Sequence, residues 1–151
     1  MRQPSYPFIY TQRVIYAHTD QMQVVYYARY FEFIEAARNE LLRHCGFPYK
    51  ELEALGLRLP VVSAHLDYFS PARYDDELLI ETCVDKLENV RITLGYQGYE
   101  KFSRLKLFSG YTVHAFVSAQ GKPIRPPKAL LEALQPYLRA QPAQSEALSL
   151  P

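Results

Sequence analysis

The 151-residue chain has no tryptophan, only two cysteines and no excess of either charge. Its longest apolar runs fall far short of the roughly 20 residues of a membrane-spanning helix, and the first thirteen residues lack the apolar core of a signal peptide. We therefore expect a cytoplasmic protein without an integral membrane segment. Cys45 and Cys83 stand apart from any histidine cluster, so we expect reduced, buried thiols and no metal site.

The net charge and the length of the chain bear on its partner and on its number of domains. Seventeen Lys and Arg against sixteen Asp and Glu give a net charge of +1, which argues against nucleic acid as the main partner. A hydrophobic content of 48% is enough for the core of one domain of this length. We expect that domain to span residues 1–139, followed by a loosely ordered, polar and proline-containing tail over residues 140–151.

The longest amphipathic pattern begins near Tyr27 and predicts a central helix that ends at Gly46, ahead of Pro48. Apolar side chains recur at helical spacing along it, and we expect them to form its buried face: Tyr27, Tyr30, Phe31, Ile34, Ala37, Leu41 and Leu42. The opposite face is predicted to be exposed and carries Arg29, Glu32, Glu35, Arg38, Asn39 and Arg43. Shorter helices are predicted over residues 49–55 and 128–138.

The remaining patterns are typical of β-strands, rich in β-branched and aromatic residues. Strands are predicted over residues 11–16, 61–69, 76–87, 91–97 and 105–118. The short connections between the last three favour an antiparallel meander. The fold class is therefore α+β, with an antiparallel sheet wrapped around one long central helix. Such a sheet has exposed edges and an uncovered face, so we expect the chain to dimerise.

Asp20 lies in a short polar segment just ahead of the central helix. A carboxylate at this place can serve as a catalytic base or nucleophile, or simply as a helix cap or loop acid. His18, two residues earlier, could assist Asp20 as a second acid or base; the alternative is a solvated or hydrogen-bonded side chain.

These residues carry a resemblance to a known family. The run RVIYAHTDQMQVVYYARYFEFIEAARNELL resembles the signature of the 4-hydroxybenzoyl-CoA thioesterase family of hotdog-fold proteins, and LPVVSAHLDYFSPARYDDELLIET and HAFVSAQGKPIRPP extend the likeness over about residues 12–135. Within the family the chain is most similar to small bacterial acyl-CoA thioesterases, some of them linked to the Tol-Pal envelope system.

The resemblance implies an acyl-CoA thioesterase in which Asp20 is the catalytic carboxylate, as nucleophile or general base. The backbone N–H of Tyr27, at the helix start, would polarise the thioester carbonyl, with Val25 and Tyr26 beside the substrate. The CoA portion would lie near Asn89, Val90 and Arg91, in a site shared between subunits of a homodimer or homotetramer. CoA is part of the substrate, and no other cofactor is implied. The alternatives are a thioesterase acting on acyl-carrier protein and a non-catalytic acyl-CoA binding or envelope-associated module.

One residue departs from the family pattern. Most relatives have Gly ahead of Val-Val-Tyr, whereas this chain has Gln23. Glycine is usual where the backbone needs a positive φ. Either the backbone here does not need a positive φ, or the loop geometry has shifted.

Overall fold

The computed structural model describes residues 7–139, in which five strands, three α-helices and two 3-10 helices follow one another. None of the helices in this part of the chain combines the length and apolarity needed to cross a bilayer. The elements in chain order are β1 (Phe8–Arg13), η1 (Tyr16–His18), α1 (Arg29–His44), α2 (Tyr49–Ala54), β2 (Val61–Tyr68), β3 (Glu77–Leu87), β4 (Arg91–Glu100), β5 (Lys106–Ala115), α3 (Lys128–Leu134) and η2 (Gln135–Tyr137).

The five strands form one antiparallel sheet in the order β1-β3-β4-β5-β2. The predicted meander of β3, β4 and β5 is confirmed, and it forms the centre of the sheet. β1 and β2 are the two edges. Along β2 only Leu66 is buried, so this edge strand has little cover from the rest of the chain.

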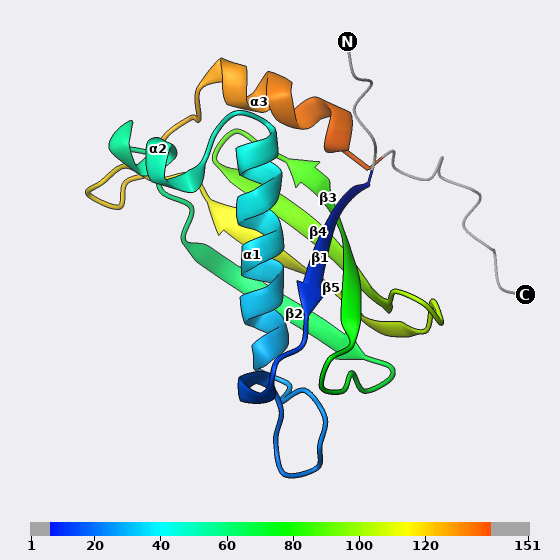
Figure 1. The fold of residues 1–151 in the computed structure, drawn as a ribbon. Helices are drawn as coiled ribbons and strands as arrows, with labels where there is room; N and C mark the ends of the chain where they lie inside the picture. Colours follow the sequence, from blue (N-terminus) through cyan, green and yellow to red (C-terminus); the bar gives the residue numbers. More distant parts are fainter. Residues whose placement is uncertain (1–6, 140–151) are drawn as a thin grey trace, which may run out of the picture.

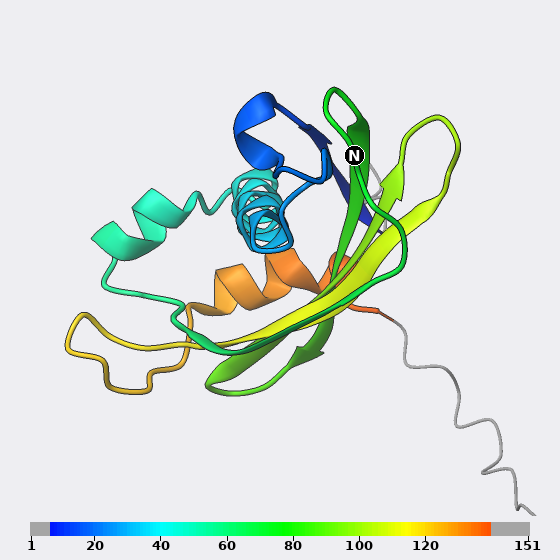
Figure 2. The same cartoon turned by 90° about the horizontal axis from the view of Figure 1, so that it is seen from below.

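The sheet curls around α1, which lies along its concave face, while α3 lies across one end (Figures 1 and 2). No described helix covers the convex face of the sheet. This arrangement is the hotdog fold, and the predicted α+β class with a single long central helix is confirmed. The buried side chains form one core between α1 and the sheet.

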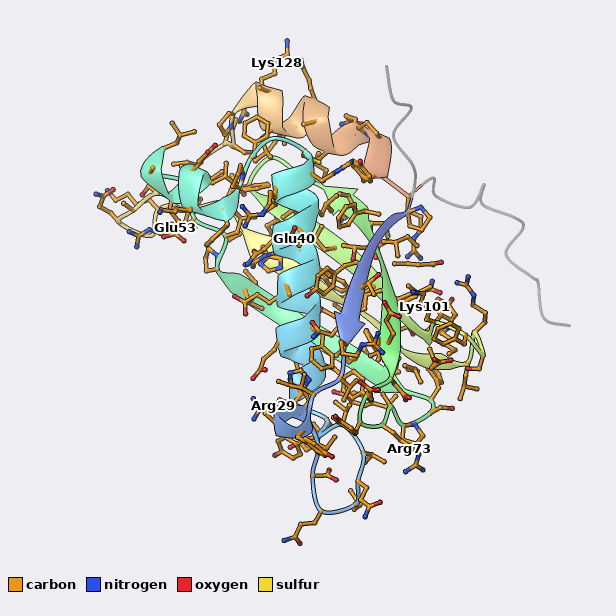
Figure 3. The ribbon with its side chains drawn as sticks, viewed as in Figure 1. Arg29, Glu40, Glu53, Arg73, Lys101 and Lys128 are labelled. Atoms are coloured by element: carbon orange, nitrogen blue, oxygen red, sulfur yellow. The ribbon has the colours of Figure 1, made fainter. Side chains whose placement is uncertain are left out.

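The start and buried face of α1 differ in detail from the prediction. The helix begins at Arg29, two residues after Tyr27, and its buried stripe runs along Tyr30, Phe33, Ile34, Ala37, Arg38, Leu41 and Leu42. Tyr27 and Phe31 are 61% and 37% exposed, so their predicted burial is wrong. Arg38, predicted to be exposed, is buried, with Tyr49 of α2 and His114 of β5 against its guanidinium. Lys128, at the start of α3, points away from the body of the protein (Figure 3).

The end of α1 is confirmed and has a clear cause. Gly46 has a φ of +87°, and its N–H donates to the carbonyl of Arg43 at 3.0 Å. The N–H of Phe47 donates to the carbonyl of Leu42 at 2.9 Å. These two bonds satisfy carbonyls that the helix leaves free at its C-terminus. The short α2 also lies within its predicted range.

Several other boundaries were placed wrongly by the sequence pattern. The first strand spans Phe8–Arg13 rather than 11–16, because the chain turns into η1 after Val14. α3 stops at Leu134, where Pro136 cannot donate the next helical hydrogen bond. β4 continues to Glu100 and β5 ends at Ala115. The tail predicted over residues 140–151 lies outside the described residues.

Candidate active site

Asp20 lies in a tight hairpin ahead of α1. Its N–H donates to the Val24 carbonyl at 3.0 Å, and the Gln23 N–H donates back to the Asp20 carbonyl at 2.9 Å. These bonds close a three-residue loop whose last residue adopts the left-handed conformation. The Asp20 Oδ1 atom accepts the Met22 N–H at 2.9 Å, a bond typical of an Asp that opens a turn. The carboxylate is therefore held in place by its own loop.

Gln23 adopts the backbone conformation that most relatives are expected to give to Gly. Its φ is +64°, which costs a residue with a Cβ about 1–2 kcal/mol. The alternative in which this backbone does not need a positive φ is therefore wrong. The turn keeps its left-handed residue, and the rest of the hairpin holds Gln23 there; a shifted loop geometry stays a prediction.

His18 anchors the base of the same hairpin. Its Nδ1 accepts the Ile15 N–H at 3.0 Å, and its carbonyl accepts the Tyr26 N–H at 2.9 Å. The ring meets Phe33 of α1 edge-on, with centroids 4.8 Å apart. Burial, aided by the charge of Arg29, lowers the pKa of His18, which favours the neutral ring that an accepting Nδ1 requires. The hydrogen-bonded alternative for His18 thus fits these contacts.

The Tyr27 N–H lies directly beyond the hairpin, before the first residue of α1. Within residues 7–139 no protein acceptor pairs with it. The N–H of Arg29, the first residue of α1, donates to the Tyr26 carbonyl at 2.8 Å. The Tyr68 hydroxyl of β2 donates to the Tyr27 carbonyl at 3.0 Å. The Tyr68 bond therefore holds the peptide group that follows Tyr27. The Tyr27 N–H shares its peptide group with the Tyr26 carbonyl, so the bond from Arg29 holds that group and leaves the Tyr27 N–H available to a ligand.

Asp20 and Tyr27 line one surface cavity of about 320 Å³. Most of its wall is apolar or aromatic, and it is lined by Asp20, Met22, Val24, Val25, Tyr27, Tyr30, Tyr68, Phe69, Ser70 and Pro71. Val25 is held in this wall because its N–H donates to the Ala72 carbonyl at 2.8 Å. The ring of Tyr26 lies beside the cavity, 4.8 Å from the ring of Tyr27. Four of the predicted site residues are thus brought together.

Residues 89–91 lie elsewhere within the same chain. All three are exposed; Asn89 and Val90 lie in the turn between β3 and β4, and Arg91 is the first residue of β4. Arg91 pairs with Ala115 of β5, whereas Tyr68 beside the cavity pairs with Phe108. Phe108 and Ala115 lie seven residues apart along β5, which is about 24 Å at roughly 3.4 Å per residue. Figure 1 shows the hairpin at one end of α1 and the β3–β4 turn at the other. One chain alone does not bring residues 89–91 to Asp20.

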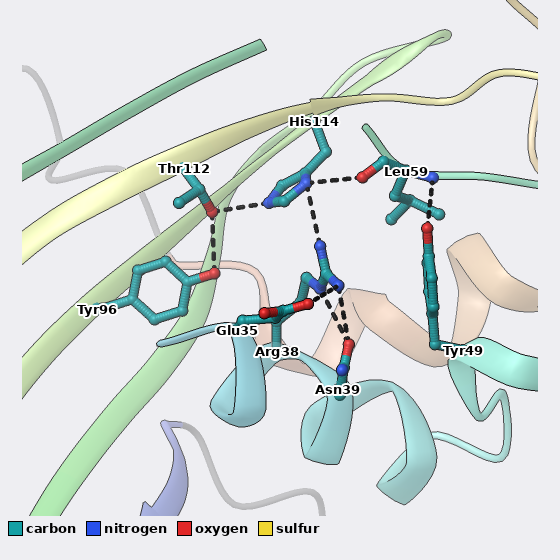
Figure 4. Close-up of polar contacts among 8 residues, drawn as sticks. All are labelled: Glu35, Arg38, Asn39, Tyr49, Leu59, Tyr96, Thr112 and His114. Carbon is teal, nitrogen blue, oxygen red and sulfur yellow. Dashed lines mark hydrogen bonds and ion pairs between the residues drawn. The ribbon is translucent and has the colours of Figure 1, made fainter. Parts of the chain in front are cut away.

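A second cavity of about 320 Å³ lies further along α1, between the helix and strands β2, β4 and β5. Four polar side chains in its wall are buried, and sequence patterns did not indicate them as site residues: Arg38, Tyr96, Thr112 and His114. The Tyr96 hydroxyl lies 2.9 Å from the Thr112 hydroxyl, which lies 2.8 Å from Nε2 of His114 (Figure 4). Nδ1 of His114 lies 3.1 Å from the Leu59 carbonyl.

Arg38 brings a charge to this cluster from α1. Its Nε and Nη2 atoms donate to Oδ1 of Asn39 at 3.1 and 3.0 Å, and Nη2 lies 3.9 Å from the Glu35 carboxylate. The guanidinium also lies 5.0 Å from the centre of the Tyr49 ring. The signal for its burial was its position four residues after Ile34, on the apolar stripe of the helix.

The two cysteines are free thiols, as predicted. Cys83 is buried and Cys45 is half-buried. Burial raises the pKa of the Cys45 thiol to about 11, so it stays protonated and unreactive near neutral pH. In the described part of the chain, no three His, Cys, Asp or Glu side chains gather in a way that could hold a metal ion.

Comparisons with known proteins agree with this fold. A model of the thioesterase-like superfamily matches residues 15–134. A protein of Aquifex aeolicus (strain VF5), provisionally named an esterase, is 33% identical over 129 residues, which are 85% of this chain and 98% of that protein. The acyl-CoA thioester hydrolase YbgC of Escherichia coli O6:H1 is 38% identical over 85 residues, 56% of this chain and 63% of that protein. The crystal structure of a hypothetical protein (AQ1494) from Aquifex aeolicus superposes with a TM-score of 0.81 at 32% identity, covering 85% of this chain and 100% of that one.

Proposed function

Because the chain belongs to the thioesterase-like superfamily, we propose that it hydrolyses an acyl-CoA thioester to a carboxylic acid and CoA. The observation that carries this proposal is the single cavity lined by both Asp20 and Tyr27. A carboxylate can act as the base or nucleophile of ester hydrolysis, and a backbone N–H without a protein acceptor can stabilise the oxygen that becomes negative. The name of the YbgC relative, an acyl-CoA thioester hydrolase, supports the same substrate class.

In the proposed reaction Asp20 acts on the thioester carbonyl carbon. As a general base it takes a proton from a water molecule, whose oxygen then bonds to that carbon; as a nucleophile its own oxygen forms the bond. The C–S bond breaks and the CoA sulfur leaves, taking up a proton. In the nucleophilic route, water then hydrolyses the resulting acyl anhydride.

The Tyr27 N–H stabilises the oxygen that becomes negative when the carbonyl carbon is attacked. A backbone donor of this kind is worth about 3–4 kcal/mol in other enzymes. The bond from the Arg29 N–H to the Tyr26 carbonyl holds the peptide group that carries the Tyr27 N–H in one orientation, so the donor needs no rearrangement during the reaction. The nearby start of α1 adds a favourable dipole.

We further propose that the site is completed by a second subunit. β2 is an edge strand whose Val61 and Val62 are 57% and 49% exposed, and such edges are commonly covered by pairing. Antiparallel pairing of two β2 strands about their midpoint, between Ala64 and His65, places the Tyr68 end of one strand beside the Val61 end of the other. The partner's β3–β4 turn then approaches the Asp20 cavity, where residues 89–91 can meet the CoA phosphates and adenine.

The test is to replace Asp20 by Asn and to measure thiol release from a panel of short, long and aromatic acyl-CoAs. We expect kcat to fall by at least about 100-fold, because general acid–base catalysis contributes roughly 10²–10⁴-fold. Glu53→Gln, which removes an exposed carboxylate of α2, is the matched control and leaves kcat unchanged. Hydrolysis by Asp20→Asn within about threefold of wild type would show that Asp20 is not the catalytic carboxylate.

The same panel separates the alternative functions. Hydrolysis confined to thioesters of acyl-carrier protein would make a carrier protein the substrate. Measurable binding of an acyl-CoA by the wild-type protein, without turnover of any thioester, would instead indicate a binding module.

A further inference from the structure

The second cavity has an apolar wall and one charged end. Phe31 and Ile34 of α1 face Val61 and Ala64 of β2 across it. Its polar groups come from Glu32, Glu35 and Arg38 of α1 and from the side chains of β4 and β5 that Figure 4 shows. An apolar cavity with a few convergent polar groups is the usual form of a small-molecule site.

The hydrogen positions in this cluster follow from its distances. The Leu59 carbonyl can only accept, so its 3.1 Å contact with Nδ1 of His114 requires a hydrogen on Nδ1. Burial, with the Arg38 charge adding to it, lowers the pKa of His114 to about 4, so the ring is neutral and Nε2 accepts the Thr112 hydroxyl. The 3.4 Å contact between Nδ1 and Nη1 of Arg38 then joins two donors.

Nη1 of Arg38 is therefore left without an acceptor among the described residues. Arg38 is only 6% exposed, and a buried donor that is left unpaired is costly. The carboxylate nearest to its guanidinium belongs to Glu35, at 3.9 Å, and that side chain is 64% exposed. Glu32, also in the cavity wall, pairs with Arg29 at 2.8 Å.

We propose that this cavity binds the far end of the acyl group and that Arg38 selects acyl groups ending in a carboxylate. A planar guanidinium donates two parallel hydrogen bonds to the two oxygens of a carboxylate, and such a ligand would supply the acceptor that Nη1 lacks. The carboxylate of Glu35 is free to turn toward water when the ligand's own carboxylate arrives.

This inference rests on the proposed thioester hydrolysis and on the pairing of two β2 strands. Val61 and Ala64, in the wall of this cavity, lie toward the end of β2 that such pairing places beside the partner's Tyr68. The thioester at one subunit's Asp20 would then lie at the mouth of the other subunit's Arg38 cavity, and the acyl chain would run between them.

The test compares acyl-CoAs of matched chain length, four to eight carbons, that end in a methyl, a hydroxyl or a carboxylate group. The dissociation constant of each is measured by calorimetry with the full-length Asp20→Asn protein, and kcat/KM with the wild type. We expect a carboxylate end to be preferred over a methyl end by at least about tenfold at the optimal length, as for a hydrogen bond to a charged group.

Arg38→Met should abolish this preference, by weakening binding of the carboxylate series while leaving the methyl series within about threefold. Arg43→Met is the matched control, because Arg43 lies on the same helix and pairs with Glu40 three residues earlier at 3.3 Å, but outside the cavity wall. It should leave the preference intact, and circular dichroism shows whether each variant folds.

Equal affinity of the Asp20→Asn protein for methyl and carboxylate ends at every length overturns the inference, even if Arg38→Met fails to fold. Equal affinity for hydroxyl and carboxylate ends overturns the assignment of a carboxylate. If a folded Arg38→Met protein binds the methyl-ended and the carboxylate-ended acyl-CoAs more weakly to the same degree, the role of Arg38 in selecting a carboxylate is also overturned. If the wild type hydrolyses no thioester while the carboxylate preference in affinity persists, the proposed function fails and the assignment of the cavity stands.

Discussion

His114 makes the stability of the protein depend on pH in a way that can be calculated from its surroundings. His114 is 2% exposed; its ring contacts Arg38 from α1 and the uncharged Thr112 from β5, and Tyr96 of β4 lies behind Thr112. Burial, the neighbouring Arg38 charge adding to it, lowers its pKa from 6.5 to about 4. Between these two pH values the unfolded chain binds a proton at this residue and the folded chain does not.

The free energy of unfolding must therefore fall as the pH falls from 6.5 toward 4. The full difference between the two pKa values, at about 1.36 kcal/mol per pKa unit, is worth about 3 kcal/mol. About 1.4 kcal/mol of it is lost by pH 5.5 and about 2.5 kcal/mol by pH 4.5. For a domain of this size such a loss is a large part of the total stability.

The assay is urea denaturation of the wild type and of His114→Asn at pH 7.5, 6.5, 5.5 and 4.5. The Asn amide can still donate to the Leu59 carbonyl but does not titrate, so the variant loses a constant amount of about 1–3 kcal/mol. The difference in free energy of unfolding between the wild type and His114→Asn should shrink by the amounts given above as the pH falls. The carboxylates titrate alike in the two proteins, so they do not affect this difference. A difference that is constant within about 0.5 kcal/mol across this range would refute the reasoning.

Two further predictions concern the hairpin and the peptide beside it. Tyr68→Phe removes the hydroxyl that holds the Tyr27 carbonyl. This carbonyl lies in the peptide next to the one that carries the Tyr27 N–H, so a looser Tyr27 should lower kcat about fivefold with little change in KM. Tyr74→Phe, at a ring that stacks on Tyr16 at the surface, should leave both constants unchanged. An unchanged kcat in Tyr68→Phe would contradict the role of this bond. Gln23→Gly relieves the positive φ and should raise the free energy of unfolding in urea by about 0.5–1 kcal/mol, whereas Gln21→Gly should not; a loss of stability in Gln23→Gly would show that the Gln side chain holds the loop.

The parts of the molecule that could be predicted from sequence are those specified by short-range patterns. The spacing of Tyr30, Ile34 and Leu41 indicated the helix and most of its buried face, and Gly46 with Pro48 indicated its end. The place of Asp20 ahead of that helix followed from the same stretch. Each of these features depends on residues within a few positions of one another, and such signals are present in the sequence itself.

What could not be predicted depends on how distant segments meet. Arg38 was predicted to be exposed because it is charged, although it lies four residues after Ile34, and its contacts with His114 of β5 and Tyr49 of α2 come from segments far along the chain. The separation of Arg91 from the Asp20 hairpin depends on strand registers that no local pattern encodes. The positive φ at Gln23 could not be decided from the sequence either, because a residue with a Cβ seldom adopts it.

The closed hairpin around Asp20 also has a consequence for the order in which the molecule folds. Its bonds, such as that from the Asp20 N–H to the Val24 carbonyl, join residues a few positions apart, and loops of about ten residues close in roughly 10–100 ns. By contrast, Phe8 of β1 must find Thr82 of β3, a search that slows folding because the intervening chain loses entropy. The carboxylate can therefore acquire its local orientation early, but the hairpin docks only when Val25 reaches Ala72.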